Sequence, residues 1–257
     1  MQPHELISQA IRQGAESGGA MVPFVTAGFP TKEAFPEILE EIAPHADVIE
    51  IGVPFSDPMA DGMTIQRTSF KAIENGVNLS WILQSLSEVK DRVSTPFVLM
   101  SYLNPMLAYG FERLAEDAAA AGVCGFIVPD LPFEESAPLR QALASAGLGL
   151  IQLVTPATPP QRLAMLCEAS RGFVYAVTVT GITGGGGSGF SNETETYLAR
   201  VRAASALPVC AGFGVRERAD VVRVSQHAHG AIVGSALLEV LEHGQSPGAF
   251  LRELRGT

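Results

Sequence analysis

Eight short apolar segments recur along this chain, separated by stretches with a helical pattern, and this repeat constrains the fold more than any other feature. Most of the segments are apolar at nearly every position, which is typical of strands buried on both faces of a parallel sheet. We therefore expect strands at residues 20–26, 47–53, 96–102, 125–130, 149–154, 173–179, 207–213 and 230–234.

The intervening stretches carry apolar residues at three- and four-residue spacing, which predicts amphipathic helices. The clearest cover residues 32–45, 111–122, 134–147, 159–170, 193–205 and 217–227, and residues 1–16 predict a helix before the first strand. Eight β-α units in 257 residues predict an α/β protein, a single-domain (β/α)8 TIM barrel over residues 1–257 with an extra N-terminal helix. A doubly wound open sheet is the alternative, but it usually carries GxGxxG where this chain reads TAGFPT.

The charge balance argues against two classes of partner. The formal net charge is −10, with only 17 Lys and Arg residues, so nucleic acid and anionic membranes are not expected to bind. The three cysteines are widely separated and show no metal-binding spacing, which indicates reduced thiols and no metal. The N-terminus lacks the features of a signal peptide, and no apolar run reaches the roughly 18 residues of a membrane span. A cytoplasmic location is therefore expected.

Residues 48–62, VIEIGVPFSDPMADG, combine a strand that contains a glutamate with a loop that contains an aspartate. Glu50 interrupts an apolar strand, where a carboxylate is costly unless it is paired or used. Asp61 follows in the next loop, and the two carboxylates form a natural arrangement for acid–base chemistry. The alternatives are a Glu50 that pairs with a buried base and aspartates, Asp57 and Asp61, that only stabilise turns.

Glycines follow the seventh and eighth expected strands, in AGFGV (211–215) and VGSAL (233–237). In a barrel these strand ends commonly bind phosphate, because glycine lets the backbone approach the ligand and a helix N-terminus offers unpaired N–H groups. Ser235 lies at such a helix start. Ordinary tight turns between strand and helix are the alternative interpretation.

The segment TVTGITGGGGSG (178–189) follows the sixth expected strand. Its glycine content favours a lid that closes over substrate and excludes water, with Thr183 as the hydroxyl that reaches a carboxylate. A plain flexible loop is the alternative. Tyr175, in the preceding strand, either points its hydroxyl into the pocket or fills the barrel core.

Several motifs, in this order, resemble the alpha subunit family of tryptophan synthase: PFVTAGFP, IEIGVPFSDPMADGMTIQ, MSYLNP, VPDLPFEES, TGITG, AGFGV and GSAL. The resemblance covers nearly the whole chain. It implies a (β/α)8 barrel that acts as a carbon–carbon lyase, cleaving indole-3-glycerol phosphate to indole and glyceraldehyde 3-phosphate in tryptophan biosynthesis.

The same resemblance assigns roles to individual residues. It makes Glu50 and Asp61 catalytic, with Tyr175 and Thr183 in support. It places Gly184, Gly212, Gly214, Gly234 and Ser235 at the phosphate, and it lines an indole pocket with Phe24, Met100, Ile127, Phe213 and Ile232.

The resemblance also implies a partner, the beta subunit, which holds pyridoxal phosphate and forms an allosteric alpha2-beta2 heterotetramer. No cofactor is expected in this chain. The expected contact surface includes Pro54, Asp57, Pro58, Asn104 and Pro105. Because four glycines, Gly184–Gly187, make lid closure entropically costly, we expect weak activity without the partner. The alternatives are a stand-alone lyase and a catalytically weak, allosteric phosphate-binding subunit.

Overall fold

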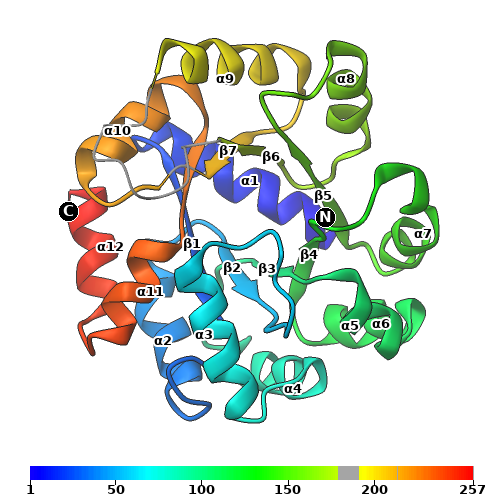
Figure 1. The fold of residues 1–257 in the computed structure, drawn as a ribbon, viewed down its shortest axis with the longest axis vertical. Helices are drawn as coiled ribbons and strands as arrows, with labels where there is room; N and C mark the ends of the chain where they lie inside the picture. Colours follow the sequence, from blue (N-terminus) through cyan, green and yellow to red (C-terminus); the bar gives the residue numbers. More distant parts are fainter. Residues whose placement is uncertain (179–190, 213, 257) are drawn as a thin grey trace.

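The computed structural model describes residues 1–178, 191–212 and 214–256, which form a closed barrel of parallel strands surrounded by helices (Figure 1). Each strand pairs with the next in the chain, and the last pairs with the first. All eight predicted strands are confirmed, and the predicted barrel is therefore correct. The strands are β1 (Ala20–Thr26), β2 (Ile49–Gly52), β3 (Phe97–Met100), β4 (Val123–Ile127), β5 (Gly149–Val154), β6 (Val174–Val177), β7 (Val209–Gly212) and β8 (Gly230–Val233).

Helices connect the strands and cover the outside of the barrel (Figure 1). The helices predicted from sequence are present, with bounds that differ by at most three residues, since helix ends are the least certain part of a pattern. The described helices are α1 (Pro3–Glu16), α2 (Ala34–Ile42), α3 (Met63–Glu74), α4 (Leu79–Val89), α5 (Leu103–Tyr109), α6 (Phe111–Ala120), α7 (Ala137–Ser145), α8 (Pro160–Ala169), α9 (Asn192–Ala204), α10 (Arg218–His227), α11 (Ser235–Glu242) and α12 (Pro247–Arg255), with short 3-10 turns η1 (Ala43–His45) and η2 (Phe133–Glu135).

The extra helix α1 closes the N-terminal end of the barrel. Ile7 and Ile11 on one face are fully buried and pack against the residues that fill the barrel interior. Helix α1 is also fixed by a polar contact at that end. The hydroxyl of Ser8 donates a hydrogen bond to the carbonyl of Gly172, two residues before β6. With this end plugged, the C-terminal ends of the strands are left as the open face, where barrels of this type carry their active sites.

The barrel interior is largely apolar, with one acidic side chain, that of Glu50. It is filled by side chains from alternate positions of the strands, among them Val22, Val98, Ile127 and Ile151, all buried. Glu50 is the only acidic or basic residue among the fully buried side chains of the described strands. The three cysteines, Cys124, Cys167 and Cys210, are buried and unpaired, as expected. None of the described helices is long and apolar enough to cross a membrane.

Candidate active site

Glu50 lies in β2, aligned with Phe24 on one side and Val98 on the other. Its side chain is 1% exposed, and neither carboxyl oxygen has a hydrogen-bond partner among the described residues. Burial, and secondarily the negative charge of Asp61, raises the pKa of Glu50 to about 8. The alternative of a Glu50 paired with a buried base finds no support among the described residues, and a carboxyl with this pKa carries a proton at neutral pH.

Asp61 sits in the loop that joins β2 to α3, and the loop is folded tightly. The Asp61 N–H donates to the carbonyl of Pro58, and the Gln66 side chain donates to the carbonyl of Asp61 at 2.9 Å. Burial raises the pKa of Asp61, while a hydrogen bond from Tyr102 opposes that rise. The loop therefore holds the second carboxylate at the open end of the barrel, close enough to Glu50 to affect its ionisation.

Tyr102, two residues after the end of β3, is a site residue that the sequence did not identify. Its hydroxyl donates to Asp61 Oδ2 at 3.1 Å and accepts from the Ala60 N–H at 2.9 Å. Its ring stacks on Phe55, with the ring centroids 4.9 Å apart. Burial raises the pKa of Tyr102 to about 12, so the hydroxyl remains a donor at neutral pH. The only signal in the sequence was its place in MSYLNP, at the C-terminal end of a barrel strand.

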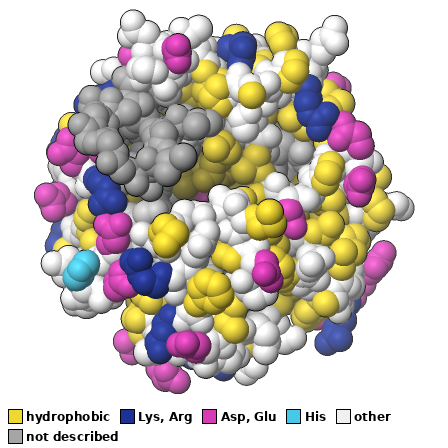
Figure 2. Space-filling view, viewed as in Figure 1, with side chains coloured by type: hydrophobic (Ala, Val, Ile, Leu, Met, Phe, Trp, Pro, Cys, Tyr) yellow, Lys and Arg dark blue, Asp and Glu magenta, His cyan; other side chains and the backbone are white. Residues whose placement is uncertain are grey.

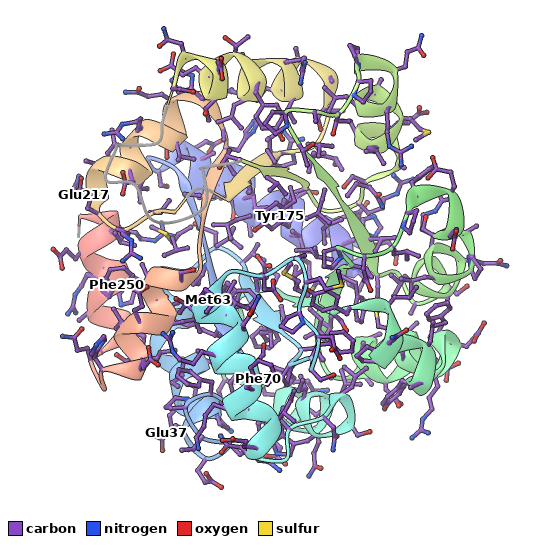
Figure 3. The ribbon with its side chains drawn as sticks, viewed as in Figure 1. Glu37, Met63, Phe70, Tyr175, Glu217 and Phe250 are labelled. Carbon is purple, nitrogen blue, oxygen red and sulfur yellow. The ribbon has the colours of Figure 1, made fainter. Side chains whose placement is uncertain are left out.

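Tyr175 lies in β6, aligned with Cys210 of β7, near the centre of the molecule (Figure 3). A side chain added at Gly212 would come within 2.8 Å of the Tyr175 hydroxyl, so that hydroxyl lies against the end of β7. Burial raises the pKa of Tyr175 well above its usual value, and the charges of Glu50 and Asp61 add to the rise. Tyr175 thus belongs to the same interior cluster as both carboxylates.

Four of the five residues predicted to line an apolar pocket are described. Phe24, Ile127 and Ile232 are buried in the barrel, and Met100 at the end of β3 is partly exposed. Phe24 lies between the end of β2 and the end of β8. Its ring occupies the space beside Gly52, and its Cβ would lie 3.8 Å from a Cβ placed on Gly234. Figure 2 shows hydrophobic side chains in the hollow at the centre of this face. Phe213 lies outside the described residues.

Gly212 is the last residue of β7 and Gly214 follows in the next loop, while Gly234 lies between β8 and Ser235, the first residue of α11. Gly214 has φ +34°, a conformation that favours glycine, and both the N–H and the hydroxyl of Thr178 donate to the carbonyl of Gly212. Ser235 is the first residue of α11, so the unpaired N–H groups of that helix face the barrel mouth. Thr183 and Gly184 lie outside the described residues.

The loop residues predicted to contact a partner differ in exposure. Asp57 and Asn104 are exposed and Pro105 is partly exposed, whereas the side chains of Pro54 and Pro58 are buried within this chain. The surface of these loops is formed instead by neighbours such as Met59, which is 94% exposed, and Leu107, which is 54% exposed. Pro54 and Pro58 mark this loop in the sequence, but both pack inward, and other side chains of the loops face outward.

Comparisons with known proteins identify relatives over nearly the full length. The sequence pattern of the family described as "Tryptophan synthase alpha chain" matches residues 11–255. The tryptophan synthase alpha chain of Desulfovibrio desulfuricans is 46% identical over 250 residues, which cover 96% of this chain and 98% of the relative. The solved structure of Mycobacterium tuberculosis tryptophan synthase has a TM-score of 0.89 at 36% identity, covering 97% of this chain and 96% of that chain. Tryptophan synthase subunit alpha from Legionella pneumophila has a TM-score of 0.89 at 29% identity, covering 100% and 98%.

The fold and the site define a (β/α)8-barrel enzyme whose chemistry lies at the C-terminal ends of its strands. The chain belongs to the tryptophan synthase alpha chain family, whose members are lyases of tryptophan biosynthesis.

Proposed function

We propose that this chain cleaves indole-3-glycerol phosphate to indole and glyceraldehyde 3-phosphate, with Glu50 and Asp61 as its catalytic groups. The observation that carries the assignment of these residues is the buried carboxyl of Glu50, which has no partner among the described residues and a pKa of about 8. Such a group is suited to exchange protons with a substrate at neutral pH.

The reaction is a retro-aldol cleavage. Carbon 3 of the indole ring gains a proton, which places positive charge at the ring nitrogen. The hydroxyl on the adjacent side-chain carbon loses its proton, the carbon–carbon bond breaks, and its electron pair restores the aromatic ring. One proton enters and one leaves, so the products are a neutral indole and an aldehyde.

Two carboxyls with different surroundings can divide this work. Glu50, protonated in its apolar site, supplies the proton to carbon 3 and accepts the hydroxyl proton. Asp61, held by Tyr102, accepts the indole N–H hydrogen bond and stabilises the positive charge that develops there. We assign Tyr175 a supporting role, because the charges of both carboxylates add to the rise that burial causes in its pKa.

The phosphate is assigned to the ends of β7 and β8. Gly212, Gly214 and Gly234 let the backbone approach it, and the start of α11 at Ser235 supplies N–H donors and favourable potential. This anchor fixes the distance from the phosphate to the bond that breaks, which lets binding energy orient the reacting carbon.

We further propose that the chain works as the alpha subunit of an alpha2-beta2 complex in the cytoplasm, with pyridoxal phosphate on the beta subunit. The exposed Asp57, Met59, Asn104 and Leu107 support a contact through the loops that follow β2 and β3. The same β2 loop carries Asp61 at its far end, so a contact with the partner can influence the position of that carboxylate.

The test is indole release from indole-3-glycerol phosphate by the purified chain, with and without the beta subunit. We expect slow release alone and faster release with the partner, whereas a stand-alone lyase would be fast alone and a purely allosteric subunit would release none. Asp61→Asn should abolish cleavage and leave binding of glycerol 3-phosphate intact. Cleavage that survives this change would remove Asp61 from the mechanism.

A further inference from the structure

A pair of charged residues joins the two halves of the phosphate site. Arg216 lies in the loop after β7, two residues beyond Gly214, and Glu239 lies on α11, four residues beyond Ser235. The guanidinium of Arg216 donates to both carboxylate oxygens of Glu239, at 2.8 and 3.1 Å. Two N–H groups of the planar guanidinium bind the two carboxylate oxygens at once. The pair therefore restricts the orientation of the Arg216 side chain relative to Glu239, as well as the distance between them.

The Thr64 hydroxyl is also near the carboxylate of Glu239 and helps to lower its pKa. Thr64 belongs to the first turn of α3, three residues after Asp61, and α3 lies beside α11 (Figure 1). Arg216 is the dominant cause of the lowered pKa of Glu239, so the carboxylate stays ionised and the ion pair persists at neutral pH. Glu239 is therefore a junction between the β7 loop, α11 and the segment that follows Asp61.

The position of Glu239 also has an electrostatic consequence. Four residues span about 6 Å along a helix, so this negative charge lies roughly one turn from the proposed phosphate position at Ser235. An unneutralised carboxylate there would repel the phosphate. Pairing with Arg216 offsets that repulsion and, at the same time, ties the glycine loop to the helix.

We infer that Arg216 and Glu239 are positioning residues that hold the β7 loop, with Gly212 and Gly214, against the start of α11, and so pre-form the phosphate site. This inference rests on the proposed function, since it assigns phosphate to that site. The two residues do not contact the reacting atoms. They act by keeping two separate groups of N–H donors in one arrangement, which lowers the ordering cost when the phosphate binds.

The chain contains a matched control. Arg67 on α3 donates to both oxygens of Glu242, at 2.7 and 2.6 Å, on the same helix α11. This second pair has the same chemistry and comparable exposure, but it ties α11 to α3 and does not touch the β7 loop. Any effect due only to losing a surface ion pair on α11 should appear equally in Arg67→Gln.

The experiment measures binding of sn-glycerol 3-phosphate and of indole by calorimetry, and steady-state cleavage with the beta subunit present. The variants are Arg216→Gln, Glu239→Gln, the double variant, Arg216→Lys and Arg67→Gln. We expect Arg216→Gln and Glu239→Gln each to weaken glycerol 3-phosphate binding about three- to tenfold, the range between an exposed ion pair and a strong bidentate one. KM should rise by a similar factor, with kcat and indole binding little changed.

The double variant should be no weaker than the worse single variant, because both changes break one interaction. Arg216→Lys, which keeps the charge but not the fork, should show an intermediate loss, and Arg67→Gln none.

Three results would overturn the inference. Tighter binding by Glu239→Gln would mean that the carboxylate acts only by repulsion. Weaker binding by Arg216→Gln but not by Glu239→Gln would also remove the positioning role: Arg216 would contact the phosphate directly if the double variant binds equally weakly, and would only neutralise Glu239 if the double variant binds normally. Unchanged binding in both would reduce the pair to an ordinary surface contact. If instead the unaltered chain neither binds glycerol 3-phosphate nor releases indole, the proposed function itself fails, and the two failures are thereby distinguished.

Discussion

Replacing Glu50 with glutamine keeps the shape of the side chain and removes its ability to ionise, and the structure predicts that this changes stability in a pH-dependent way. The carboxyl has an ordinary pKa of 4.5 when the chain is unfolded and about 8 in the folded protein. The folded state therefore holds the proton more tightly than the unfolded state. Stability from this group is fully present below pH 4.5 and is lost as the pH rises towards and through about 8.

The magnitude follows from the pKa difference. At roughly 1.4 kcal/mol per pKa unit, ionising Glu50 in its buried site costs about 5 kcal/mol in total. Glutamine avoids that cost, so Glu50→Gln should gain stability over the unaltered chain by about 2 kcal/mol at pH 6 and about 3 kcal/mol at pH 7. The gain should level off at about 5 kcal/mol above the folded pKa.

The assay is urea-induced unfolding of both proteins at a series of pH values, comparing free energies of unfolding at each pH so that all other groups cancel. Glu134→Gln is the control of opposite character, because Arg162 lowers the pKa of Glu134 to about 2. That carboxylate is ionised throughout the neutral range, so its variant should differ from the parent by a constant amount. A constant difference for Glu50→Gln as well would refute the reasoning, since it would mean that Glu50 is hydrated or paired.

Three further predictions follow from other parts of the site. Tyr102→Phe keeps the ring stacked on Phe55 but loses the hydrogen bond to Asp61. The value of kcat should therefore fall about tenfold or more, while glycerol 3-phosphate binding stays unchanged in calorimetry. An unaltered kcat would show that Asp61 does not need the hydrogen bond from Tyr102. Gly52→Ala places a methyl group 2.4 Å from the Phe24 ring, so the ring must move. Indole binding should therefore weaken severalfold in a fluorescence titration. Equal indole affinity would count against Phe24 as a wall of the indole pocket. We predict a lid whose glycine run, Gly184–Gly187, would be costly to order, so indole release is expected to rise when the beta subunit is added; equal rates would contradict this prediction.

The barrel could be predicted from the sequence because its strands are buried on both faces. That burial leaves continuous apolar runs, and parallel pairing of consecutive strands needs no long-range information beyond the repeat itself. Glu50 was visible for the same reason, as a charge inside one of those runs. The glycines at the ends of β7 and β8 could be located because their position in the repeat fixed the face on which they lie.

The polar contacts that organise the site could not be predicted in the same way. Tyr102 and Asp61 are 41 positions apart, and Arg216 and Glu239 are 23 apart, so neither pair leaves a local pattern. Tyrosine after a strand and arginine in a loop both fit ordinary surface roles. The inward packing of Pro54 and Pro58 was likewise hidden, because a proline in a loop reads the same whether it faces solvent or the core.

The central claim is that a protonated Glu50 performs the chemistry, and the pH dependence of kcat/KM for indole-3-glycerol phosphate cleavage tests it most directly. This parameter reports the ionisation of essential groups in the free enzyme. With Glu50 as the acid, kcat/KM should fall above about pH 8, as the buried carboxyl loses its proton. A kcat/KM that stays constant from pH 7 to well above 8 would contradict the claim, because an ionised Glu50 cannot supply the proton to carbon 3.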